Sequence, residues 1–365
     1  MKKIIIFILT MILTLSVTGC KKQKYPPVKS SKEEAKVVMT LQIENEKYEV
    51  KYELYRALFL SNRSSVDGGD RSVWNGEDKE KYIAEINEII TEKAAKIFSA
   101  FHLAKSLGID PYSKEVDAQV EEYIRISVEG DGETLGFGGN YEEYLKFLTD
   151  AGLNYSTQEL MLRYSILLEK IDEYYKGRND DALGYVNSKY NLSEDELRSY
   201  YFSDDCVRVI HAYMQEGVGG DTRAKMEEIR QGISSADSDI NAALYIINHT
   251  LVTPTDLIVN KKVSGITVGK YSIDETYEAY RASAFSLSPG ETGDIVEIND
   301  GTKGYYVIHA LEKSEEHYNM CNEEIKLSFF DNLISKRLTE IAGELTSNHA
   351  FEKNYQDINH GDISI

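Results

Sequence analysis

The chain has 365 residues, which is enough for two or more domains and a substantial core. It carries 61 acidic residues against 41 basic ones, for a formal net charge of −20. No basic block offsets this acidity, so we expect no nucleic-acid partner.

The first twenty residues have the pattern of a lipoprotein signal peptide. Two lysines precede an apolar run over residues 4–17, which is too short for a relaxed membrane span. The run ends in Val17-Thr18-Gly19-Cys20, which resembles the bacterial lipobox. We predict that residues 1–19 are removed and that acyl chains on Cys20 anchor the protein to the membrane. The alternative is an ordinary signal peptide with a chance cysteine.

A mostly helical region follows a polar tether that spans residues 20–36. Alternating apolar residues predict strand, turn and strand over 39–50, and a helix from about Tyr52. Apolar residues at spacings of three and four predict a long helix from about Glu77 to Leu107. Further helix starts are predicted at Ser113 and at three capping boxes, Asn140 with Glu143, Ser156 with Glu159, and Ser193 with Glu196.

The sequence changes character near Phe202. Alternation over residues 207–211 predicts a strand, an amphipathic helix follows over 222–232, and 304–311 is rich in β-forming residues. We therefore predict an α+β unit at 202–313, followed by a C-terminal helical segment at 314–365.

Cysteine and histidine content predicts no metal site and no cofactor. The seven histidines are scattered without metal-ligand spacing, and no Walker loop, Gly-x-Ser-x-Gly or His-Glu-x-x-His motif occurs. Cys206 and Cys321 have no zinc or redox signature. Two free thiols and one disulfide remain open alternatives for this pair.

Five short motifs, in the same order, resemble the SurA/PrsA family of foldases. They are Ala104-Lys105-Ser106-Leu107-Gly108-Ile109; Leu192 to Leu197 with Tyr200-Tyr201; Arg208-Val209-Ile210-His211; Ala284-Phe285-Ser286-Leu287-Ser288-Pro289-Gly290-Glu291; and Gly304-Tyr305-Tyr306-Val307-Ile308. The resemblance implies a SurA-N-like helical chaperone module at 37–201. It also implies an inserted parvulin-like domain at 202–313, and a C-terminal helix within 314–365 that packs back on the module.

The resemblance also maps a prolyl-isomerase site onto this chain. His211 matches the first parvulin histidine, Asp256 lies near the acidic position, and Tyr306 replaces the second histidine. The floor that receives the proline ring would be Val268, Thr276, Tyr280 and Phe285. Thr276 replaces a methionine and Tyr280 a phenylalanine, so we expect a partly degenerate site.

The sequence and this resemblance are consistent with three functions. The first is a peptidyl-prolyl isomerase and foldase at the extracytoplasmic face of the membrane, with unfolded or partly folded exported polypeptides as partners. The second is a non-catalytic holdase or assembly factor on the same fold. The third is a solute-binding lipoprotein, which would need two α/β lobes with repeated βαβ units. The resemblance also leaves a homodimer open.

Overall fold

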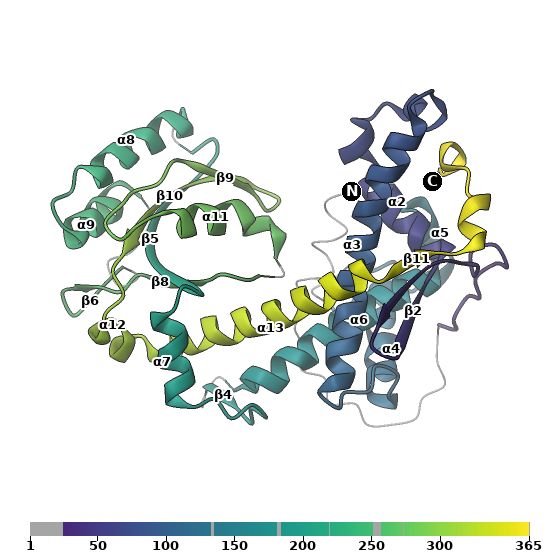
Figure 1. The fold of residues 1–365 in the computed structure, drawn as a ribbon, viewed down its shortest axis with the longest axis horizontal. Coiled ribbons are helices and arrows are strands. Elements are labelled where there is room, and N and C mark those ends of the chain that lie inside the picture. The colour runs from purple at the N-terminus through teal and green to yellow at the C-terminus, as the bar shows by residue number, and fades with distance from the viewer. Residues whose placement is uncertain are drawn as a thin grey trace. The chain divides into compact units, whose positions relative to one another are not determined.

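The computed structural model describes residues 25–132, 135–180, 184–218, 220–250, 257–272 and 274–364. The chain divides into two compact units (Figure 1). Unit 1 takes the described residues up to Ile171 and again from Arg337, and unit 2 takes Asp172–Lys336. Unit 2 is thus inserted into unit 1 in sequence. Two long helices, α6 (Tyr155–Lys176) and α13 (Asn322–Ser347), each contribute residues to both units.

Unit 1 contains a three-stranded antiparallel sheet in the order β11 (His349–Phe351), β1 (Val37–Ile43) and β2 (Glu46–Lys51). The predicted strand, turn and strand are confirmed. Tyr48 and Val50 of β2 are buried and their neighbours are more exposed, as the period of two requires. Among the described residues β2 pairs with β1 alone, so the other edge of β2 has no strand beside it.

Helices make up most of unit 1. In chain order they are α2 (Tyr52–Asp67), η1 (Arg71–Asn75), α3 (Lys79–Ser106), α4 (Lys114–Glu129), α5 (Tyr141–Asp150), the first part of α6, the last part of α13, η3 (Lys353–Asp357) and η4 (His360–Asp362). The long predicted helix is confirmed as α3. Its residues Ile86, Ile90, Ala94 and Phe101 are buried along one apolar face.

One predicted helix cap in unit 1 is wrong. The structure begins α6 at Tyr155, and the side chain of Asn154 accepts a hydrogen bond from Thr157 N at 2.9 Å. The hydroxyl of Ser156 instead donates to Glu53 at 2.9 Å. Glu53 is buried, and a buried carboxylate needs several donors, so a tertiary contact takes the serine that sequence reasoning assigned to the cap.

Unit 2 is built around an antiparallel sheet in the order β8 (Ile266–Gly269), β5 (Cys206–Gln215), β10 (Lys303–Leu311) and β9 (Val296–Asn299). All strand pairs among the described residues are antiparallel. The predicted α+β class is confirmed. The parallel βαβ units of a solute-binding lobe do not occur in the described parts of the chain.

The two faces of this sheet are covered by different helices. Helices α8 (Thr222–Ser234) and α9 (Asp239–His249) pack on one face, and α11 (Glu278–Ser286) packs on the other. The α8–α9 face is an apolar core that includes Ile210, Ala212, Ile229, Ile246, Tyr305 and Val307. The α11 face includes Val209, Tyr280, Ala284, Ile298 and Ile308.

Short elements complete unit 2. They are β3 (Arg178–Asp180), β4 (Gly184–Val186), α7 (Glu194–Phe202), β6 (Ile258–Val259), β7 (Lys262–Val263), η2 (Glu275–Tyr277), α12 (Glu315–Met320), the last part of α6 and the first part of α13. The capping box of Ser193 and Glu196 is confirmed, with both reciprocal hydrogen bonds present. Cys206 and Cys321 are both free thiols in the structure.

A membrane-spanning helix is not found among the described residues, because none of their helices combines sufficient length with sufficient apolar character. The predicted signal peptide and the lipidated Cys20 lie outside the described residues. The anchor therefore stays a prediction from the sequence.

Candidate functional site

Strand alternation brings the predicted site residues to the α11 face of the sheet in unit 2. His211 lies on β5 and Tyr306 on β10, and these neighbouring strands pair antiparallel. Successive side chains of a strand point to opposite faces. His211 therefore shares a face with Val207 and Val209, and Tyr306 shares it with Ile308. Tyr280 reaches the same face from α11.

Three rings form a compact cluster, which we call the His211 cluster: His211, Tyr280 and Tyr306. The ring centroids of His211 and Tyr280 are 5.6 Å apart, and those of His211 and Tyr306 are 5.3 Å apart. Tyr280 and Tyr306 are also 5.3 Å apart. All three pairs meet edge to face, at interplanar angles of 87°, 74° and 80°. Each such pair contributes about 0.5–1.5 kcal/mol beyond area burial.

A hydrogen bond fixes the imidazole in this cluster. The hydroxyl of Tyr280 lies 2.8 Å from Nδ1 of His211. Burial lowers the pKa of His211, because desolvation penalises the charged ring. Burial also raises the pKa of Tyr280 and of Tyr306, so both hydroxyls stay protonated. The His211 cluster is therefore uncharged at neutral pH.

The other predicted floor residues are placed differently from one another. Val268 joins the α11 face, because it pairs directly with Val207 on the adjacent strand. Thr276 is exposed in the short helix η2. Phe285 is half-buried on α11. Asp256 lies outside the described residues. The structure thus brings His211, Val268, Tyr280 and Tyr306 together.

Two tyrosines that the sequence reasoning missed extend the cluster. Tyr213 pairs directly with Tyr306 across the strands, with ring centroids 4.8 Å apart. Tyr277 lies 6.4 Å from Tyr306 and donates a hydrogen bond to Asp300 at 2.9 Å. Tyr213 stands two residues after His211 on one strand, so the period of two was a signal for it. Tyr277 carried no comparable signal.

A glycine diagonally across the paired strands from Tyr213 leaves room for its ring. A Cβ atom added at Gly304 would lie 2.4 Å from a ring carbon of Tyr213. Any larger residue at this position would push Tyr213 away, and Tyr213 contacts Tyr306. Glycine here serves close packing of the aromatic surface.

The arrangement suits a reaction that needs no charged catalyst. Rotation about a peptide bond faces a barrier of about 18–20 kcal/mol that comes from amide resonance. A surface lowers this barrier when it desolvates the bond and fits the twisted geometry better than the planar one. The His211 cluster offers neutral rings, hydroxyl donors and one imidazole.

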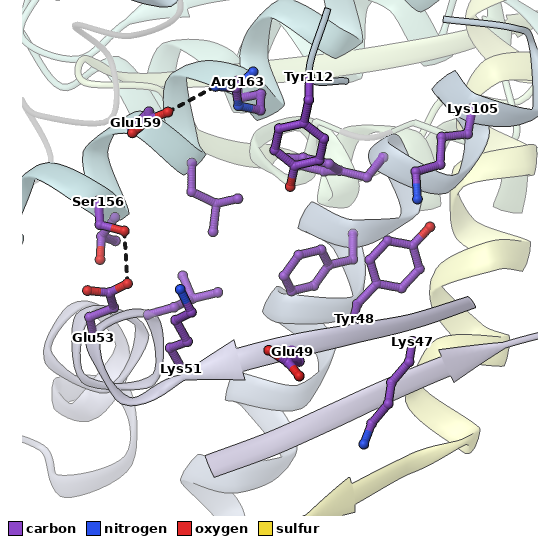
Figure 2. Close-up of a pocket in the computed structure, with 15 residues that line it drawn as sticks. Lys47, Tyr48, Glu49, Lys51, Glu53, Lys105, Tyr112, Ser156, Glu159 and Arg163 are labelled. Atoms are coloured by element: carbon purple, nitrogen blue, oxygen red, sulfur yellow. Dashed lines mark hydrogen bonds and ion pairs between the residues drawn. The ribbon is translucent and has the colours of Figure 1, made fainter. Parts of the chain in front are cut away.

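Unit 1 contains a second candidate site, a groove of about 520 Å³ (Figure 2). Strand β2 runs along it, and α2, α3 and α6 supply further lining residues. The aromatic lining residues are Tyr48, Phe98, Phe101 and Tyr112, and the cationic ones are Lys47, Lys51, Lys105 and Arg163. The edge of β2 that has no strand beside it among the described residues lies along the groove.

Contacts within the groove fix its aromatic walls. The rings of Tyr48 and Phe98 stack with centroids 5.1 Å apart. The guanidinium of Arg163 lies 4.9 Å from the ring centroid of Tyr112, and Arg163 also pairs with Glu159 at 2.9 Å. Tyr112 is 62% exposed, which leaves most of its ring open to a ligand.

Comparisons with known proteins give fold likenesses to foldases. No family model matches the chain, and no curated protein matches it. The foldase protein PrsA from Streptococcus pneumoniae is 15% identical, with 87% of this chain and 97% of that chain covered and a TM-score of 0.30. PrsA from Bacillus subtilis is 16% identical, with 91% and 100% covered and a TM-score of 0.23. The peptidylprolyl isomerase (PrsA) from Bacillus anthracis is 14% identical, with 71% and 96% covered and a TM-score of 0.26.

Proposed function

We propose that the protein is a membrane-anchored foldase of the SurA/PrsA type that acts on exported polypeptides, with a parvulin-like prolyl-isomerase site at the His211 cluster. The observation that carries the proposal is the edge-to-face clustering of three uncharged rings, buried Tyr280 with half-buried His211 and Tyr306, at positions that the family resemblance maps to the isomerase site. The lipobox ending in Cys20 supports the location outside the cytoplasm.

Each ring has a defined part in this proposal. His211 and Tyr306 contact the imide, and Val268 supplies apolar surface beside it. Tyr280 orients His211 through its hydrogen bond at 2.8 Å. A tyrosine in place of the second histidine donates through one hydroxyl only and lacks the two ring nitrogens of imidazole. We therefore expect catalysis that is measurable but weak.

The test is a prolyl-isomerisation assay on soluble protein from Lys21 onward with a short X-Pro peptide. We expect acceleration above the uncatalysed rate that is lost in His211→Ala. His249→Ala is the matched control, because His249 is exposed at the end of α9 and belongs to the other face of the sheet. Acceleration that survives His211→Ala would remove His211 from the site. No acceleration by folded wild-type protein would contradict the isomerase proposal.

A specific observation favours a second function, the non-catalytic holdase. The groove of unit 1 combines aromatic walls with the free edge of β2, and the occupant that satisfies both is an extended polypeptide segment. Such a segment adds a strand to the edge and places alternate side chains against the rings. Main-chain hydrogen bonds would bind many sequences with little discrimination, which suits a holdase.

The holdase function is tested with a reduced, unfolded client whose aggregation is followed by light scattering. We expect wild-type protein to suppress aggregation and Tyr112→Ala to suppress it less, because Tyr112 is the most exposed ring of the groove. Tyr185→Ala is the matched control, since Tyr185 is also exposed but lies on β4 in unit 2. Equal suppression by Tyr112→Ala and wild type would exclude Tyr112 from client binding.

A further inference from the structure

Three potential metal ligands meet where α12 ends and α13 begins. His317 lies on α12, Cys321 follows this helix, and Glu324 is in the first turn of α13. One donor atom from each residue lies within 4.8 Å of the donor atoms of the other two. We propose that His317, Cys321 and Glu324 form a zinc-binding site.

The surroundings hold the His317 ring in a fixed orientation. His317 is 1% exposed, and its Nδ1 lies 2.8 Å from the hydroxyl of Tyr201. The backbone N–H of Ser314 donates to the same hydroxyl at 3.3 Å. Metal-bound histidines usually engage their second ring nitrogen in such a hydrogen bond, which fixes the tautomer and the orientation of the ring.

The other ring nitrogen of His317, Nε2, would be the zinc ligand. This Nε2 is buried and makes no hydrogen bond of normal geometry with any residue that the structure describes, although the backbone of Ser264 comes close enough to favour a protonated ring. A buried polar nitrogen without a well-formed partner destabilises the folded state. Coordination of a metal ion would remove that destabilisation.

Glu324 is held by the neighbouring strand. One of its carboxylate oxygens accepts a hydrogen bond from Thr267 N on β8 at 2.6 Å. The carboxylate is thus positioned by Thr267. Cys321 is a free, half-buried thiol. The three side chains therefore provide one nitrogen, one sulfur and one oxygen donor.

The donor set selects zinc among common ions. Zn²⁺ accepts nitrogen, sulfur and oxygen ligands at about 2.0–2.3 Å in a tetrahedral arrangement, whereas calcium and magnesium require oxygen ligands. The donors need to approach by on the order of 1 Å to reach this arrangement. Three protein ligands leave a fourth position for water or for a group of another molecule.

Zinc binding would need both anionic ligands, Cys321 and Glu324, because the positive charge of Arg208 lies nearby. Burial lowers the pKa of the His317 imidazole, and the nearby buried guanidinium of Arg208 lowers it further. This positive charge opposes a bare cation. Its side chain donates to the carbonyl oxygens of Val263, Ser264 and Glu312, which disperses part of the charge. The thiolate of Cys321 and the carboxylate of Glu324 would together neutralise the two charges of the ion, so loss of either should weaken binding strongly.

The experiment uses metal-free soluble protein from Lys21 onward, titrated with zinc chloride in competition with a chromophoric chelator. We expect one zinc ion per chain, and binding at least about tenfold weaker in Cys321→Ser and in Glu324→Gln. Glu323→Gln is the matched control, because Glu323 is the exposed neighbour of Glu324 and should bind as wild type does. Cobalt in place of zinc should give a thiolate charge-transfer band that Cys321→Ser abolishes.

Two outcomes would overturn the site. One is folded wild-type protein, judged by circular dichroism, that binds no zinc. The other is stoichiometric zinc binding that both Cys321→Ser and Glu324→Gln retain, which would place the ion elsewhere. Neither outcome bears on the isomerase proposal, because the three residues lie outside the His211 cluster and the assays are separate.

Discussion

The two faces of the sheet in unit 2 are formed by the same strands but carry different kinds of side chain. Ile210 and His211 are consecutive on β5, yet Ile210 enters the apolar core under α8 and α9, while His211 joins the tyrosines under α11. His309 on β10 provides the matching contrast. It lies 2.9 Å from the hydroxyl of Thr292 and 3.3 Å from Asp239, so both of its ring nitrogens have partners. Among the residues that the structure describes, His211 has one such contact, with Tyr280. The α8–α9 face thus holds a histidine with both ring nitrogens hydrogen-bonded, and the α11 face holds His211 among tyrosine rings.

The largest expected effect comes from replacing either of two consecutive residues of β5, Ile210 and His211, by alanine. Ile210→Ala should lower the free energy of unfolding by about 2–5 kcal/mol, because it opens a cavity in a core where Ile210 is 1% exposed. The isomerase rate per folded molecule should not change. His211→Ala should abolish the rate at a smaller cost in stability. Urea unfolding and the isomerase assay on both variants measure this. Loss of rate in folded Ile210→Ala would contradict the separation of the faces.

The next effect concerns the histidine on the opposite face. His309→Ala removes the partner of Thr292 and of Asp239 and should destabilise the protein by about 1–3 kcal/mol. Isomerase activity at a temperature where the variant is folded should equal that of wild type. Thermal unfolding followed by circular dichroism, together with the rate, checks both statements. A variant as stable as wild type would show that the two contacts of His309 contribute nothing to the free energy of unfolding.

A gain of function would sharpen the comparison. Tyr306→His restores a second imidazole beside His211, in a position where the ring centroids are now 5.3 Å apart. One additional oriented hydrogen bond is worth about 1 kcal/mol, so kcat/KM should rise about fivefold. The assay with the same X-Pro peptide measures it. An unchanged or lower kcat/KM would mean that Tyr306 already supplies what the site uses.

The smallest expected effect is a pH dependence. The lowered pKa of His211 means that the unfolded state binds a proton before the folded state does as the pH falls below about 6.5. Wild-type protein should therefore lose stability through this group as the pH decreases, by at most about 1.4 kcal/mol per pH unit. His211→Gln should show a shallower decrease in urea unfolding. Parallel pH profiles for the two proteins would contradict a depressed pKa.

Much of this architecture was predictable from local patterns. The β1–β2 hairpin, helix α3, the cap at Ser193 and the alternation on β5 all follow from spacing and turn chemistry that a few neighbouring residues decide. Ser156 shows where such reasoning ends, because a distant buried carboxylate, Glu53, takes its hydroxyl. Local sequence patterns do not predict a hydrogen bond to a residue that is distant in sequence.

The candidate site shows the same limit. His211, Tyr280 and Tyr306 were predicted through motif resemblance, and strand alternation accounts for Tyr213. Tyr277 reaches the cluster from a short helical turn whose direction no periodic pattern sets. The group of His317, Cys321 and Glu324 also escaped sequence reasoning, because its spacing matches no familiar metal motif and depends on the junction between two helices.

The pairing of β11 with β1 has a consequence for the order of events during folding. Strand β1 ends at Ile43, whereas its partner β11 begins at His349, and Thr40 bonds to Glu352 across a separation of 312 residues. Closing so large a loop costs considerable chain entropy unless the intervening segment has already become compact. Unit 2, whose sheet forms within residues 206–311, can fold first and bring these ends within reach. A chain that emerges across a membrane from its N-terminus would leave β1 unpaired on one side until nearly all of the sequence had followed.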